Sequence, residues 1–87
     1  MKLHVMSVKD NAAQTFGRPF FMPSTGVALR SFTDEVNRAA EDNQLYKHPE
    51  DFDLYQLGTF DDETGVFELL TFPKVFARAK EVAIEVK

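Results

Sequence analysis

Side chains that could do catalytic chemistry are few and far apart in this 87-residue sequence. The two histidines are His4, within an alternating strand pattern, and His48, directly before a proline; neither has a partner at a metal-ligand spacing. Cysteine is absent, which excludes disulfides, thiolate metal sites and cysteine nucleophiles. We therefore expect no catalytic site, no metal site and no cofactor, and we predict that the protein is not an enzyme.

Carboxylates gather at residues 50–53 and 61–63, and paired acids can act as acid/base couples or bind divalent cations. The second group lies at a predicted hairpin tip, where aspartate favours turns, and it lacks the spaced oxygen ligands of a calcium loop. The first group follows Pro49 and suits a turn. Both groups are interpreted as structural.

A cation among aromatic residues is the strongest binding signal in the chain. The segment FGRPFF at residues 16–21 places Arg18 between phenylalanines, as grooves for single-stranded nucleic acid do when they combine stacking with charge. Phenylalanines in a strand are more often core residues, so the core interpretation of this segment is favoured and nucleic-acid binding is the alternative. Arg30 is unusual because the macrodipole disfavours a cation near the start of a helix. The candidate DNA contacts are Arg18, Phe20, Arg30, Tyr46 and Lys47.

Length and composition limit these candidates. The chain is 44% hydrophobic and is long enough for one domain, so we predict a single domain over residues 1–87 with a less certain extension at 74–87. The net charge of −4 argues against broad coating of phosphates, because such binding depends on many cations. A short chain with nine phenylalanines and an edge strand also predicts a homodimer.

Periodicity places the elements that must position these residues. Alternation over residues 3–9 predicts a strand, and a second extended segment at 15–22 is interrupted by Gly17 and Pro19. Helical spacing predicts a helix over residues 26–41, capped by Ser24 or Thr25.

The second half of the chain predicts a β-hairpin. Residues 52–60 and 66–70 are rich in strand formers and flank a turn at 61–65, where Gly65 supplies a positive φ. The tail fits a short helix through residues 75–83 followed by an extended end, although residues 82–86 also alternate like a strand.

These elements predict an α+β fold. We expect a small antiparallel sheet in the order strand-strand-helix-strand-strand, with one principal helix packed on one face. The residues expected to be buried are Leu29, Phe32, Val36, Leu54 and Phe67. No apolar run approaches the length of a membrane span, so no membrane association is predicted.

Two sequence blocks resemble a known family. They are GVALRSF at residues 26–32 and HPEDFDLYQLGTFDDETG at residues 48–65. They are similar to the "GVAIRxF" and "HPEDFxLxxLGxFDxETG" blocks of the small nonstructural protein of gokushoviruses, microviruses that are single-stranded DNA bacteriophages. The resemblance covers most of residues 1–70 and fades beyond that.

The resemblance implies a nonstructural phage protein in the host bacterial cytoplasm that is associated with single-stranded DNA, during genome synthesis or during the handover of that DNA to packaging. Two hypotheses remain open. In the first, the protein contacts single-stranded DNA through its cations and aromatic residues. In the second, a dimeric module binds a phage replication or assembly protein, or a host factor, without contacting DNA. The acidic charge favours the second hypothesis, whereas the resemblance and residues 16–21 favour the first.

Overall fold

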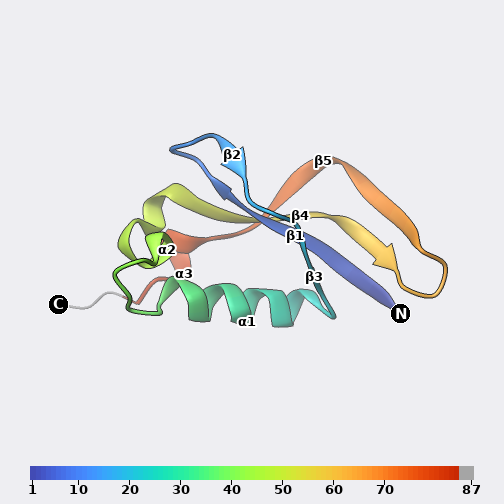
Figure 1. The fold of residues 1–87 in the computed structure, drawn as a ribbon, viewed down its shortest axis with the longest axis horizontal. Coiled ribbons are helices and arrows are strands. Elements are labelled where there is room, and N and C mark those ends of the chain that lie inside the picture. The colour runs from blue at the N-terminus through green and yellow to red at the C-terminus, as the bar shows by residue number, and fades with distance from the viewer. Residues whose placement is uncertain (85–87) are drawn as a thin grey trace.

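The chain folds into a curled antiparallel sheet with helices against one face, in a computed structural model that describes residues 1–84 (Figure 1). The strands are β1 (Lys2–Asp10), β2 (Thr15–Phe16), β3 (Phe20–Met22), β4 (Phe52–Asp61) and β5 (Val66–Arg78). The helical segments are α1 (Thr25–Val36), α2 (Gln44–Lys47), the 3-10 turn η1 (Pro49–Asp51) and α3 (Ala79–Val82). The predicted α+β class with an antiparallel sheet is confirmed. Within the described residues, no helix has the length and apolarity needed to cross a membrane.

Strand β1 lies at the centre of the sheet. It pairs along its whole length with β4, and on its other side with β2 and β3 in turn. Strand β5 pairs with β4 and forms the outer edge. The predicted order strand-strand-helix-strand-strand is too simple, because residues 17–19 divide the second extended segment into β2 and β3. Pro19 has no N–H to donate to a continuous ladder.

The core lies between α1 and the facing side of the sheet. Ala28, Phe32 and Val36 of α1 are buried against Met6 of β1 and Leu54 of β4. The Ser24 side chain caps the helix by accepting a hydrogen bond from the Val27 N–H. Helix α1 is the longest helix of the described residues.

Helix α1 ends at Val36, so the prediction that it continues to residue 41 is wrong. The buried Asn43 side chain donates hydrogen bonds to the carbonyl oxygens of Glu35 and Arg38, and it also caps α2. Asparagine side chains compete in this way with the helical hydrogen bonds of the backbone. The chain therefore turns into α2 rather than extending α1.

The burial predictions are confirmed for Phe32, Val36 and Leu54 and wrong for two residues. Leu29 is 38% exposed because it lies on the outer side of α1, and Phe67 is 52% exposed because it lies on the edge strand β5. The sequence pattern marks Phe67 as apolar, and nothing in the described part of the chain covers it fully.

The predicted hairpin is confirmed. Gly65 has φ +74° and donates its N–H to the Asp61 carbonyl oxygen at 2.7 Å, which closes the turn between β4 and β5. The predicted tail helix is wrong over residues 75–78, which belong to β5, and helix α3 begins only at Ala79. The expected extended end runs into residues 85–87, which lie outside the described residues.

Strand β5 leaves its partner over part of its length. Gln56 pairs with Lys74 and Gly58 pairs with Leu69, so Leu57 alone stands opposite residues 70–73. We call residues 70–73 the arch, and Figure 1 shows β5 standing away from β4 there. The arch carries Pro73, which suits a segment outside the ladder.

Candidate nucleic-acid interface

The sheet side opposite α1 carries two groups of aromatic rings, and we call this side the aromatic face. Its members are Phe16, Phe21, Tyr55, Phe60 and Phe67. Phe16 and Tyr55 meet edge to face with ring centroids 5.0 Å apart. Phe21, Phe60 and Phe67 form a cluster, in which the Phe60 ring centroid lies 5.6 Å from that of Phe21 and 4.7 Å from that of Phe67, and the Phe21 and Phe67 centroids are 6.3 Å apart. These separations are those of favourable aromatic pairs.

Strand alternation explains why these rings lie opposite the helix. Successive side chains of a strand point to opposite faces, so neighbouring residues have different surroundings. Phe20 packs on the core beneath α1, whereas the next residue, Phe21, is exposed beside Phe60. In the same way Met6 faces α1 and Val5 faces away from it.

A cation joins the aromatic face at Phe16. The Lys9 ammonium lies 5.5 Å from the centroid of the Phe16 ring, and these two residues are register partners of β1 and β2. An ammonium at this distance from a ring interacts with its π-system. The arrangement presents charge and a flat ring side by side.

Arg18 is held near this group by a tethered loop. The Gly17 N–H donates to the Val8 carbonyl oxygen at 2.8 Å, and the Ser7 hydroxyl donates to the Gly17 carbonyl oxygen at 2.8 Å. Ser7 is fully buried, so this anchor is protected from water. The loop therefore carries the exposed Arg18 one residue beyond a fixed point on β1.

The Asp53 carboxylate, opposite Lys9 in the sheet register, forms a salt bridge with an arginine. Asp53 pairs with Lys9 across β1 and β4, and it is buried. It accepts hydrogen bonds from Asn11 at 2.9 Å and from the Arg78 guanidinium at 3.0 Å. Arg78 therefore balances the Asp53 charge and reduces repulsion of an anionic ligand at this end of the face.

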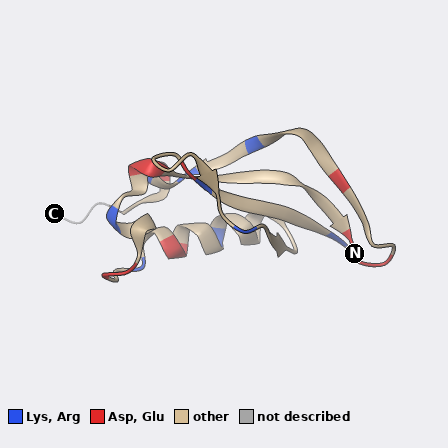
Figure 2. Cartoon of the chain, turned by 45° about the horizontal axis from the view of Figure 1, so that its top comes forward, with Lys and Arg blue, Asp and Glu red and all other residues tan. Residues whose placement is uncertain are grey.

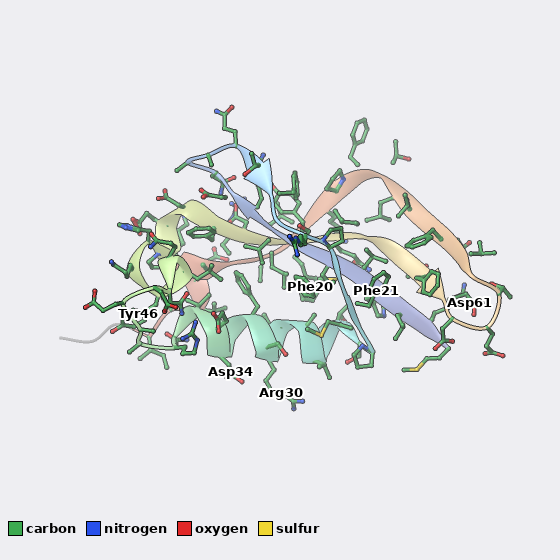
Figure 3. The ribbon with its side chains drawn as sticks, in the orientation of Figure 1. Phe20, Phe21, Arg30, Asp34, Tyr46 and Asp61 are labelled. Atoms are coloured by element: carbon green, nitrogen blue, oxygen red, sulfur yellow. The ribbon has the colours of Figure 1, made fainter. Side chains whose placement is uncertain are left out.

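The five predicted contact residues are spread over four separate segments of the chain. Arg18 is in the loop between β2 and β3, and Phe20 begins β3 but is turned toward the core. Arg30 points from α1 away from the sheet (Figure 3), on the opposite side of the molecule from the aromatic face. Tyr46 and Lys47 are together in α2 and line a shallow hollow with Ala39, Ala40 and Glu41.

Several residues of the aromatic face were missed from the sequence. Phe16 lies in the Phe-rich segment, but periodicity alone does not say which of its rings face a helix. The sequence pattern identifies Lys9 and Tyr55 only as strand residues. The usable signal was alternation: once α1 is placed on the side of Met6 and Val8, the side chains of the other parity must face away from it.

The acidic hairpin tip is occupied by internal contacts rather than arranged around an empty cation site. The Met1 amine lies 2.8 Å from both Asp62 and Glu63, and hydrogen bonds to these carboxylates raise its pKa. The Asp61 carboxylate accepts from the Glu63 N–H, which lowers the Asp61 pKa. Figure 2 shows acidic residues at this tip and Lys and Arg spread over several elements.

A second acidic group, His48, Glu50 and Asp51, brings possible metal ligands close together near η1. Its His48 Nδ1 is 3.8 Å from a Glu50 oxygen, and both side chains are more exposed than buried. Exposed carboxylates of this kind are ordinary surface features, and this group belongs to the turn after α2.

Comparison with known proteins identifies the family. The model of the phage ORF5 protein family matches residues 3–82. The protein named ORF5 of Chlamydia phage 1 is 35% identical over 69 residues, which cover 77% of this chain and 72% of that protein. No solved structure matches the chain significantly. The family match includes residues 74–82, beyond the part that the two sequence blocks suggested. The chain therefore belongs to the phage ORF5 protein family, and its resemblance to the small nonstructural protein of gokushoviruses is confirmed.

Proposed function

We propose that this phage ORF5 protein is a non-enzymatic accessory protein that binds single-stranded DNA in the host bacterial cytoplasm, during genome synthesis or its handover to packaging. The observation that carries the proposal is the Lys9–Phe16–Tyr55 group on the open side of the sheet. Every base has a face that stacks on an aromatic ring, so such a group binds single strands with little sequence preference.

Arg18 supplies a phosphate contact beside this group. It is exposed, and its loop is fixed to β1 through Gly17. A strand whose bases stack on Phe16 or Tyr55 would run its backbone past Lys9 and Arg18. Stacking contributes about 1–3 kcal/mol per base, so two rings and two cations supply weak but measurable affinity.

The net charge of −4 limits this binding to a local patch. Affinity for single strands falls with salt at a log–log slope of about −0.7 per neutralised phosphate. Two cations therefore predict a slope of roughly −1.4, much shallower than that of a strongly basic protein. Cooperative coating of DNA by this chain is not expected.

Fluorescence anisotropy with labelled oligodeoxynucleotides, across a salt series, tests the proposal. We expect Phe16→Ala to weaken binding about 5- to 150-fold, as loss of one stacking contact does. Lys80→Ala is the matched control for Arg18→Ala, since it removes one exposed positive charge from α3. No binding of the folded protein at low salt would contradict the proposal, as would equal losses in the Phe16 and Lys80 variants.

The second hypothesis, a module that binds a phage replication or assembly protein or a host factor, is favoured by a different observation. Much of β5 is apolar and exposed, including Val66, Leu69 and Phe72. Large exposed apolar patches mark protein contacts. If the titration shows no DNA binding, we expect this exposed surface of β5 to bind the partner protein.

A further inference from the structure

We propose that the chain forms a symmetric homodimer in which the arch of each copy, carrying Leu70 and Phe72, enters an apolar hollow of the other copy. This proposal does not depend on DNA binding. It rests on an apolar projection and an apolar hollow that lie side by side on one chain.

The hollow is a shallow space of about 620 Å³ beside the arch. Its described lining is entirely apolar and comes from β1, the β2–β3 loop, β3, β4 and β5: Val5, Pro19, Phe21, Leu57, Phe67 and Leu69. A DNA strand would bring phosphates to a surface whose described lining offers them no cation. An apolar side chain is the chemically matched occupant.

The projection is the arch itself. The Phe72 side chain is 79% exposed, and Leu70 is exposed as well. The arch leaves the ladder between Leu69 and Lys74, so its residues are not held by pairing with β4. A phenylalanine this exposed has little contact with its own chain, yet it represents a large apolar area.

A second copy fits both features at once. In a two-fold dimer the same patch meets itself, so a projection next to a hollow fills the partner's hollow and receives the partner's projection. Because each chain fills the hollow of the other, the assembly is complete with two chains. It therefore covers the exposed apolar edge without leaving a surface for further growth.

The exposed area is of the size that a stable dimer needs. Fully exposed phenylalanines present about 150–250 Å², so Phe21, Phe67 and Phe72, at 46%, 52% and 79% exposure, leave on the order of 350 Å² open. Val66, Leu69 and Leu70 add exposed aliphatic area to the same strand. Standard interfaces bury about 800 Å² per partner, rim included, so this apolar patch is large enough to form the centre of one.

Variants of the full chain that carry opposite charges test the exchange. We expect analytical ultracentrifugation at micromolar concentration to report a dimer for the unchanged protein. Phe72→Asp and Leu69→Lys each replace a residue that is largely exposed in the single chain, so the fold should survive, and circular dichroism checks this. Each variant alone should dimerise about 30-fold or more weakly, as expected for loss of a central contact.

Mixing the two variants should restore a heterodimer. The carboxylate introduced by Phe72→Asp in one chain then meets the ammonium introduced by Leu69→Lys in the other, while the second contact stays native. Leu29→Asp, an exposed change on the outer side of α1, is the control and should leave the dimer intact. An unchanged protein that is monomeric at micromolar concentration would overturn the proposal. A dimer that Phe72→Asp does not weaken, or one that the mixture does not restore, would overturn it as well.

Discussion

Gly58 lies so close to β5 that a Cβ at this position would be 2.7 Å from the Leu69 Cα, and it would also overlap the Glu68 carbonyl oxygen. Gly58 and Leu69 are register partners at the start of the arch. Real Cβ atoms do not approach a backbone so closely, and the obstacle is backbone rather than a flexible side chain. Gly58 therefore allows β4 to approach β5 just before the two strands separate.

Replacing this glycine should destabilise the protein. We expect Gly58→Ala to lower the free energy of unfolding by about 3 kcal/mol, because overpacking forces the two backbones apart. Gly26→Ala is the control: Gly26 lies in α1, its added Cβ would meet only the Ser24 Oγ at 3.9 Å, and alanine is the better helix former by about 0.5–1 kcal/mol. Urea unfolding of both variants measures the difference, and equal stability would contradict the packing argument.

The sequence predicts the elements that depend on local pattern. The β1 alternation, the Ser24 cap and the turn at Gly65 each follow from a few neighbouring residues, and each is present. The end of α1 does not follow, because it depends on Asn43, which reaches back from the next segment to the Glu35 and Arg38 carbonyls. Local helical spacing continues past Val36 and carries no sign of that contact.

The candidate site shows the same division. Residues 16–21 were recognisable as a place where a cation meets aromatic rings, and Arg18 is exposed there. The choice of Phe20 rather than Phe16 or Phe21 required knowing which side of β3 is covered by α1. Lys9 and Tyr55 were out of reach, because they join Phe16 only through the pairing of β1 with β2 and β4.

The hairpin should lose stability in acid through Asp61. The Glu63 N–H donates to its carboxylate at 2.9 Å and lowers its pKa from the ordinary value of 3.8. A depressed folded-state pKa means that the contribution is complete above the unfolded value and is lost as the pH falls through the folded value. We therefore expect the protection of the Gly65 amide from hydrogen exchange, measured relative to an unstructured chain at the same pH, to decrease as the pH falls below 3.8 and Asp61 takes up its proton.

Two variants isolate this titration. In Asp61→Asn the amide oxygen can still accept from the Glu63 N–H but does not titrate, so the acid-dependent loss of Gly65 protection should disappear. In Asp61→Ala the acceptor is gone, and the protection of the Gly65 amide should be low at every pH. An unchanged acid profile in Asp61→Asn would assign the effect to another carboxylate at the tip.

The side of the molecule that meets DNA can be decided by comparing cations on the two faces. Arg18 lies beside the aromatic face, whereas Arg30 points away from the sheet on α1 and Lys47 lies in α2. We expect Arg18→Ala to weaken binding equally for all oligonucleotide sequences and to make the salt slope shallower by about 0.7, since one phosphate contact is lost. Arg30→Ala and Lys47→Ala should change affinity less than about twofold, because exposed charges far from the site are screened beyond a Debye length of about 10 Å at roughly 0.1 M salt. The reverse result, with losses in Arg30→Ala, Lys47→Ala and Tyr46→Ala and none in Arg18→Ala or Phe16→Ala, would place the contact on the helix side. In that case the aromatic face would be left to protein contacts.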